Sequence, residues 1–372
     1  MMNAKKTVST FVGVLALLVI SVAETEAGTF TTLAPFGTTH AYATGVSGNN
    51  VVGQYLDPAS GNTLGFLYDG SNYTTLNPSG ITFSTALGVS GTKVVGQYND
   101  PMSGSPLGFL FDGSTYTTIS PSGASASVLN SVSGTNVVGS FDLEYNTNEY
   151  YTLGFLFDGS TYTTLDPFGA RFSLALGVSG NNVVGIYLDP SLDPSLGYVL
   201  GFLYDGSTYT TLNPFGTFYS RANGISGNNV VGEYRDPISN DDLGFLYDGS
   251  TYTTLNPFGT FYSRANGISG NNVVGFYQDP NNANAVKSFG FLFDGSTYTT
   301  LAPFGTSNAT ATGVSGNKVV GNYVDPSSGN TYGFLYDHSA VVPEPSTIVA
   351  ASIFVLGGLG RAWRRRKSDS TM

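Results

Sequence analysis

One short motif recurs throughout this chain of 372 residues and limits what it can fold into. "GFLYDG", or a near copy, starts at seven positions spaced 43, 46, 47, 43, 46 and 43 residues apart: Gly65, Gly108, Gly154, Gly201, Gly244, Gly290 and Gly333. "VVG" also occurs seven times. Residues 201–232 and 244–275 are identical over all 32 positions. Such a period predicts repeated units that bury their apolar faces against one another.

Each unit divides into four short extended pieces, which in the first unit are residues 43–48, 49–57, 65–69 and 73–78. Val, Tyr, Phe and Thr dominate these pieces, while Gly, Asn, Asp and Pro mark the turns between them. The 49 glycines, 24 tyrosines and 25 phenylalanines fit many short strands joined by tight turns. Four strands in about 44 residues predict the blade of a β-propeller. A β-solenoid or an open array is the main alternative.

The two ends of the repeat region favour a closed ring. The first extended piece, residues 29–37, is of the fourth-strand type, and the last, residues 333–337, is of the third-strand type. Pairing of the two would leave no open edge. We therefore expect an all-β, seven-bladed propeller over residues 28–338, closed by its N-terminal strand.

The pairing of "GFLY" with "VG" resembles the HAF-type extracellular repeats. This chain departs from that pattern, with Gly65 and its equivalents standing where the family has His-Ala. The resemblance implies an extracellular repeat protein and carries no chemistry.

The first 27 residues have the three parts of a secretory signal peptide. Lys5 and Lys6 precede an apolar run over residues 11–22, and small residues follow. We expect cleavage after Ala23 or Ala27. An uncleaved membrane anchor is the alternative, although the run is shorter than the ~20 residues of a spanning helix.

Residues 339–372 form a second segment outside the predicted ring. An apolar helix is expected over residues 347–363, and a basic cluster accompanies it: Arg361, Arg364, Arg365, Arg366 and Lys367. Positive charge stays on the cytoplasmic side of a membrane. The pattern therefore predicts a C-terminal tail anchor with the body on the opposite side.

This tail resembles the PEP-CTERM sorting signal, in which a Pro-Glu-Pro element, an apolar helix and an arginine cluster follow one another. The element here comprises Val342, Pro343, Glu344, Pro345 and Ser346. The resemblance implies recognition by the membrane protease-transpeptidase exosortase. It also implies passage through the general secretion machinery and signal peptidase. The protein would be tethered to the inner membrane of a Gram-negative bacterium, then released to the cell surface or beyond.

Charge and composition exclude several classes of function. The net charge is −11, and the repeat region holds 7 basic against 21 acidic residues. Such a body repels nucleic acid. The absence of cysteine excludes disulfides, thiol nucleophiles and cysteine-bound metals.

Titratable residues in the repeats are interpreted mainly as turn residues. The Asp of "FLYDG" and the Asp-Pro after "VVGxY" suit tight turns and loop openings. His40 and His338 do not recur, and ring closure leaves a histidine pair open. We predict no cofactor and no metal site, and whether calcium binds is left open because no loop has the usual Asp-rich pattern.

Three long loops, residues 141–153, 188–200 and 278–289, vary most between units. Their tyrosines are candidates for stacking on sugar rings, with solvated loop tips as the alternative: Tyr145, Tyr150, Tyr151 and Tyr198. Glu144, Glu149 and Asp193 are the acids to inspect for hydrolysis, which needs two carboxylates in unlike environments. The threonine rows would match ice only if they formed a flat array.

These patterns predict an exported, surface-associated protein without catalytic residues. We expect a scaffold or binding module that engages extracellular polysaccharide or other surface proteins. A carbohydrate-active hydrolase or lyase on the same scaffold is the alternative.

Overall fold

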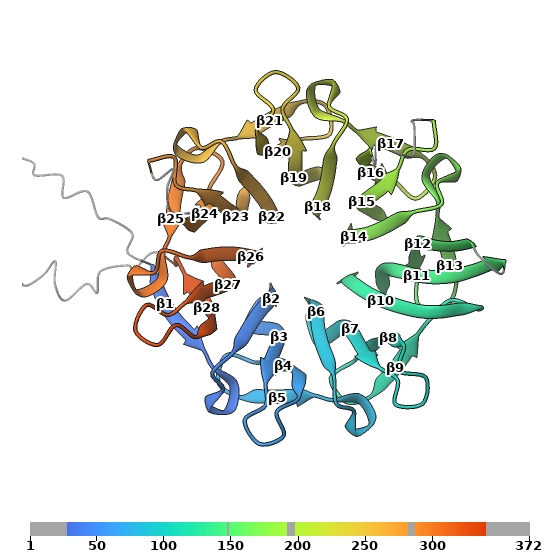
Figure 1. The fold of residues 1–372 in the computed structure, drawn as a ribbon, viewed down its shortest axis with the longest axis horizontal. Coiled ribbons are helices and arrows are strands. Elements are labelled where there is room, and N and C mark those ends of the chain that lie inside the picture. The colour runs from blue at the N-terminus through green and yellow to red at the C-terminus, as the bar shows by residue number, and fades with distance from the viewer. Residues whose placement is uncertain (1–27, 147–148, 192–197, 282–286, 340–372) are drawn as a thin grey trace, which may run out of the picture. The chain divides into compact units, whose positions relative to one another are not determined.

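The strands of this protein form a ring of seven antiparallel sheets, each of four strands. The computed structural model describes residues 28–146, 149–191, 198–281 and 287–339. Figure 1 shows the seven sheets as blades around a central axis. The described residues contain no α-helix, only strands and short 3-10 turns. The predicted seven-bladed propeller is confirmed, and the solenoid and the open array are wrong.

The strands follow the predicted order within each blade. Blades 1 and 2 comprise β2 (Ala41–Ser47), β3 (Asn50–Leu56), β4 (Thr63–Tyr68), β5 (Tyr73–Leu76), β6 (Ser84–Ser90), β7 (Lys93–Asn99), β8 (Pro106–Phe111) and β9 (Tyr116–Ile119). Blades 3 and 4 comprise β10 (Ala124–Ser133), β11 (Asn136–Asn146), β12 (Glu149–Phe157), β13 (Tyr162–Leu165), β14 (Ser173–Ser179), β15 (Asn182–Leu188), β16 (Val199–Tyr204) and β17 (Tyr209–Leu212). Blades 5 and 6 comprise β18 (Ser220–Ser226), β19 (Asn229–Arg235), β20 (Asp242–Tyr247), β21 (Tyr252–Leu255), β22 (Ser263–Ser269), β23 (Asn272–Gln278), β24 (Ser288–Phe293) and β25 (Tyr298–Leu301). Blade 7 comprises β26 (Ala309–Ser315), β27 (Lys318–Val324), β28 (Thr331–Asp337) and β1 (Thr29–Leu33).

Strand β1 closes the ring. It pairs antiparallel with β28, from Thr29 opposite Asp337 to Leu33 opposite Gly333. The N-terminal strand therefore supplies the fourth strand of the last blade, as predicted. Every sheet is completed within residues 28–339, which form one compact unit.

The glycine of "VVG" is required by a close approach between the first two strands of each blade. A Cβ added to Gly53 would lie 1.9 Å from the carbonyl oxygen of Tyr42, and one added to Gly232 would lie 1.8 Å from that of Arg221. Just beyond this contact the register shifts between Ala43 and Gly45, which marks a β-bulge. The recurrence of the motif thus follows from backbone geometry.

The hydrophobic core is divided among the interfaces between blades. The phenylalanine of "GFLYD" is fully buried in every blade: Phe66, Phe109, Phe155, Phe202, Phe245, Phe291 and Phe334. In blade 1 it packs with Val51 and Leu64, and with Val320 from blade 7. Each blade therefore depends on its neighbour for part of its core.

Buried serines join successive blades. Ser84 of blade 2 is 0% exposed; its hydroxyl donates to the Leu76 carbonyl of blade 1 at 2.6 Å and accepts from the Gly65 amide at 2.9 Å. Four further serines do the same: Ser127, Ser173, Ser220 and Ser263. Each satisfies backbone groups that would otherwise be buried without a partner.

The predicted signal peptide, sorting residues 342–346, apolar helix 347–363 and basic cluster lie outside the described residues. Within the part of the chain that the structure describes, no helix is long and apolar enough to cross a membrane.

Candidate functional site

The long loops and the links between blades lie at the same end of the strands. Isolated bridges connect the start of the third strand of one blade to the link that enters the next, as between Thr63 and Phe83 or Asp242 and Tyr262. We call this end of the ring the loop face. Because it collects the most variable segments, it is the natural place to look for a binding site.

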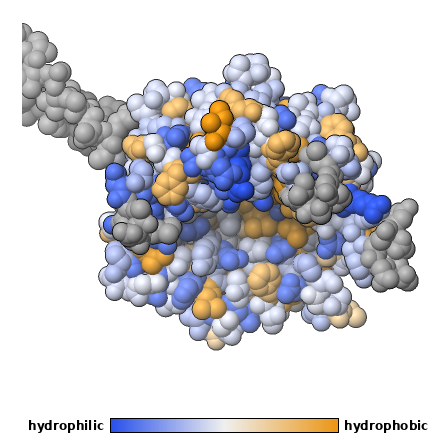
Figure 2. Space-filling model, turned by 45° about the horizontal axis from the view of Figure 1, so that its top comes forward, coloured by the Kyte–Doolittle hydropathy of each residue, from blue (hydrophilic) through white to orange (hydrophobic). Residues whose placement is uncertain are grey.

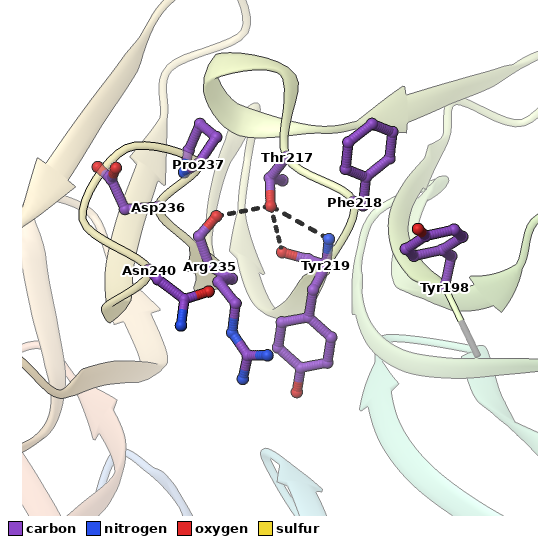
Figure 3. A pocket seen from close by; sticks show the side chains of 8 residues that line it. All are labelled: Tyr198, Thr217, Phe218, Tyr219, Arg235, Asp236, Pro237 and Asn240. Carbon is purple, nitrogen blue, oxygen red and sulfur yellow. Dashed lines mark hydrogen bonds between the residues drawn. The ribbon is translucent and has the colours of Figure 1, made fainter. Parts of the chain in front are cut away.

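A cavity of about 390 Å³ opens on the loop face between blades 4 and 5. We call it pocket 1, and Figure 3 shows the residues that line it. They come from three segments: the loop of blade 4, the link into blade 5 and the loop of blade 5. The lining residues are Tyr198, Thr217, Phe218, Tyr219, Arg235, Asp236, Pro237 and Asn240.

The hydroxyl of Thr217 holds two of these segments together. It donates to the carbonyl oxygens of Arg235, at 2.7 Å, and Tyr219, at 3.0 Å, and accepts from the Tyr219 amide at 3.1 Å (Figure 3). Thr217 is only 3% exposed. The frame of pocket 1 is therefore fixed by hydrogen bonds within the protein.

Two aromatic rings form one wall of pocket 1. The rings of Tyr198 and Phe218 lie 5.2 Å apart between centroids, inclined at 38° (Figure 3). Phe218 is 58% exposed, unusual for such a large apolar side chain. An exposed aromatic face beside polar groups is typical of a ligand-binding surface.

The opposite side of pocket 1 is polar. The Arg235 guanidinium lies 5.6 Å from the ring centroid of Tyr219 and forms a bidentate ion pair with Asp242, at 2.8 and 3.1 Å. The Asp236 carboxylate accepts from the amides of Ser239 and Ile238. These hydrogen bonds lower the pKa of Asp236, with the Ser239 amide as the largest cause.

The lowered pKa of Asp236 bears on whether this residue could act as a catalytic acid. A general acid in glycoside hydrolysis needs a raised pKa. Every described carboxylic acid with a shifted pKa has it lowered, mainly by hydrogen bonds within its own loop, as in Asp57, Asp236 and Asp325. The hydrogen bonds of Asp236 therefore work against its serving as a proton donor in pocket 1.

A second cavity, pocket 2, lies on the other side of Tyr198 and measures about 350 Å³. Its lining includes Arg171, Phe172 and Asp189. The Arg171 guanidinium also lies 5.4 Å from the ring centroid of Tyr151 in blade 3. Arg171 thus lines pocket 2 together with the predicted Tyr198 and contacts the predicted Tyr151.

Of the other predicted loop residues with a described side chain, Tyr150 and Glu144 line neither pocket. Tyr150 is 67% exposed on β12, opposite Glu144 on β11. Tyr145 lies on β11 and Glu149 begins β12. Asp193 lies outside the described residues.

The two histidines lie at opposite ends of the same strand. His40 bridges Thr331, where β28 begins, while His338 follows its last residue, Asp337. Seven residues of extended chain separate these ends by roughly 20 Å. The histidine pair that ring closure left open is therefore wrong. Among the described residues, no group of three or more His, Asp or Glu side chains could hold a metal ion.

The innermost strands leave a narrow axial cavity of about 190 Å³. Figure 2 shows a hollow with apolar residues on its wall. Side chains at the bulges cross to the next blade, as where Thr44 donates to Ala86 and Thr312 donates to Ala43, each at 2.8 Å. These hydrogen bonds join neighbouring blades near the axis, and one of them joins blade 7 to blade 1.

Sequence reasoning found Tyr198 but missed Phe218, Tyr219 and Arg235. Phe218 and its twin Phe261 occupy identical 32-residue units, so neither stood out. The signal that distinguishes them is the residue facing each from the preceding loop, a tyrosine only for Phe218.

Comparisons with known proteins establish the fold and no family. No family model and no curated protein sequence matches the chain. The β-propeller domain of the Trilobed protease from Pyrococcus furiosus superposes with a TM-score of 0.57 at 10% identity, over 81% of this chain and 96% of that one. That domain is described as having an open velcro topology, whereas the ring here is closed by β1.

Two further matches superpose more loosely. Trypanosoma rangeli sialidase has a TM-score of 0.36 at 12% identity, over 88% of this chain and 57% of its own. A subtype N11 neuraminidase-like protein of A/flat-faced bat/Peru/033/2010 (H18N11) has a TM-score of 0.39 at 11% identity, over 84% of this chain and 94% of that one. Neither bears on the activity of this chain.

Proposed function

We propose that this protein is an exported, surface-associated binding module or scaffold of the extracellular polysaccharide matrix. It engages saccharide chains, or surface proteins that carry them, through pocket 1. The observation that supports this is the exposed aromatic wall of Tyr198 and Phe218 opposite polar side chains. Aromatic faces cover the apolar side of a sugar ring, while polar groups reach its hydroxyls.

The proposal includes the route by which the protein reaches the matrix. The N-terminal segment directs secretion, and exosortase recognises Val342–Ser346 while the basic cluster keeps the tail at the membrane. This part is supported by the sequence of the two ends.

Binding is tested by co-sedimentation of residues 28–339 with the producer's extracellular polysaccharide. These residues complete every sheet among themselves, so they retain the ring. We expect retention, and we expect Phe218→Ala to weaken the affinity about tenfold because an aromatic platform contributes ~1–2 kcal/mol.

The chain supplies its own control. Phe261, 47% exposed, occupies the same place in the identical unit of the next blade, without a tyrosine facing it. Phe261→Ala should leave binding unchanged. Equal losses in both variants, or no retention of the parent, would reject pocket 1 as the site. New reducing ends during the assay would instead support the alternative, a hydrolase or lyase on the propeller.

A further inference from the structure

The arginines of the propeller are concentrated in one part of an acidic molecule. Residues 28–338 contain four arginines against 21 acidic residues. All four lie toward the loop face in blades 4 to 6 or the link into blade 4: Arg171, Arg221, Arg235 and Arg264. Two of them line the pockets, Arg171 in pocket 2 and Arg235 in pocket 1. The arginines are therefore concentrated on one part of the loop face, where acids such as Asp189 and Asp236 also lie.

The other two arginines converge on one buried carboxylate. Glu233 is 1% exposed, the only fully buried charged residue in the described part of the chain. Arg264 Nε lies 2.6 Å from Glu233 Oε2, and Arg221 Nε lies 3.5 Å from Oε1. The arginines hold equivalent positions, second in β22 and second in β18. At the place of Glu233, blade 6 has Phe276.

One negative charge does not balance two positive ones. Burial by itself works against the charged form of Arg264, but the attraction and hydrogen bond of Glu233 leave its pKa raised. Arg221 Nε is buried and makes no hydrogen bond to any described residue. The nearby Arg235–Asp242 ion pair is neutral, so it does not alter the net charge of the Arg221–Glu233–Arg264 cluster. The cluster therefore retains about one unit of positive charge.

The surplus charge is accessible and adjoins pocket 1. The side chains of Arg221 and Arg264 are 32% and 33% exposed. Tyr219, which lines pocket 1, donates its hydroxyl to Glu233 Oε1 at 3.3 Å. Glu233 thus contacts both arginines and, through Tyr219, a residue on the polar side of pocket 1.

We propose that Arg221 and Arg264 bind the carboxylate of an acidic sugar whose chain lies in pocket 1. This inference rests on the proposed function, since pocket 1 must first hold a saccharide. The planar guanidinium group matches a carboxylate through paired hydrogen bonds, which a lysine ammonium group cannot do. A uronic acid supplies such a carboxylate, so the ligand class of this proposal is a polysaccharide containing uronic acid.

The test compares two probes that differ only in charge. Residues 28–339 are titrated calorimetrically with oligogalacturonate and with the neutral galactose oligomer made by reducing its carboxyl groups. We expect the neutral oligomer to bind at least about tenfold more weakly, the loss expected for hydrogen bonds to a charged group. Raising the salt concentration should weaken only the oligogalacturonate complex.

Variants locate the charge contact. Arg221→Gln should weaken oligogalacturonate about tenfold and leave the neutral oligomer unchanged. Arg264→Gln alone would remove the shorter ion pair of the buried Glu233, so it is combined with Glu233→Gln to keep the fold, which thermal unfolding checks. Lys93→Gln removes the same charge at the opposite end of the ring, where Lys93 contacts the Gly134 carbonyl, and should change neither affinity.

The outcomes separate this inference from the proposed function. Equal binding of both oligomers would overturn the carboxylate site and leave pocket 1 as a saccharide site. Binding of neither would overturn the carboxylate site, and the co-sedimentation assay with the producer's polysaccharide would decide the proposed function separately. Tighter binding of a sulfated oligomer than of oligogalacturonate would overturn the assignment to a carboxylate. Equal losses in the Arg221 and Lys93 variants would overturn its placement.

Discussion

At the scale of single residues, the repeated aspartate of "FLYDG" serves the turn in which it lies. In blade 4 the Asp205 carboxylate accepts hydrogen bonds from the amides and hydroxyls of Ser207 and Thr208. The same pattern recurs at Asp112, Asp158, Asp248 and Asp294. These bonds, with the Thr208 amide as the largest cause at Asp205, hold the pKa well below its ordinary value of 3.8. These hydrogen bonds explain why the repeated aspartates act as turn residues, as the sequence predicted.

The lowered pKa of Asp205 predicts that its contribution to stability depends on pH. A carboxyl whose pKa is lower in the folded protein stabilises the fold above its unfolded pKa, near 3.8. That contribution is lost as the pH falls from there through the folded pKa. Asp205→Ala should therefore lower the melting temperature at pH 7, and the difference from the parent should shrink below pH 3.8.

Thermal unfolding at pH 7 and in acid measures this difference, and Asp205→Asn is the control. The amide oxygen of the asparagine still accepts hydrogen bonds but does not titrate. The asparagine variant should therefore lose less melting temperature at pH 7 than the alanine variant does. A constant deficit of the alanine variant at all pH values would contradict the role of the charge.

At the scale of elements, the "PFG" turn that enters most blades is strained and yet repeated. Its phenylalanine has a left-handed backbone, with φ between 52° and 56°, at five places: Phe36, Phe168, Phe215, Phe258 and Phe304. This conformation costs a bulky residue ~1–2 kcal/mol. Four of these rings pack on two tyrosines of the blade they precede, as Phe258 does on Tyr277 and Tyr298 at 5.3 and 6.1 Å. Phe304 packs on Tyr323 and on Phe30. Those contacts offset the strain.

Blades 2 and 3, which lack this phenylalanine, show that its ring covers the outer-strand tyrosine from solvent in blades 1, 4, 5 and 6. Their turns carry Ser79 and Ser122 instead. The outer-strand tyrosines of these blades are the exposed ones, Tyr116 at 37% and Tyr162 at 41%. Where the phenylalanine is present, burial raises the pKa of the equivalent tyrosines Tyr73, Tyr209 and Tyr252 to about 12.

Two substitutions at Phe258 separate packing from strain. Phe258→Ala loses the aromatic contacts and keeps the unfavourable backbone, so the free energy of unfolding should fall by about 1–2 kcal/mol. Phe258→Gly loses the same contacts but relieves the strain, so its deficit should be smaller. Denaturant unfolding of both variants measures the difference. If the glycine variant were the less stable of the two, the strain argument would fail.

These elements also mark how far the sequence could lead. The strand order and the closed ring were predictable because the period and the two incomplete end units specify them. The left-handed Phe258 was not, because no local rule places an aromatic residue in that conformation. Tyr198 was found in a variable loop. The Arg221–Glu233–Arg264 cluster was missed because it joins two blades through residues inside strands, where single-chain patterns indicate packing.

At the scale of the whole molecule, the ring and the tail are separable. Strand β28 ends at Asp337, and the Pro-Glu-Pro element begins at Pro343. Removal of everything from Pro343 onward would therefore take no strand from any blade. A tail that is cut away after sorting is compatible with a body that stays folded.

Sorting is tested by Glu344→Ala in the producing bacterium. We expect a longer form that stays with the membrane fraction, because exosortase would no longer recognise the element. Glu144→Ala, an exposed acid of the body, is the control and should be processed normally. Unchanged size and location of the Glu344 variant would reject exosortase processing.

The pairing of β1 with β28 also sets an order of events in time. Strand β1 leaves the ribosome first, and its partner β28 is the last strand to be made. Blades 1 to 6 can form from neighbouring chain, but blade 7 waits for contact across about 300 residues, which makes closure slow. Until then β28 offers an unpaired edge and the buried side of blade 1 faces solvent. The ring therefore cannot close before β28 has been made, and closure buries the side of blade 1 that packs against blade 7.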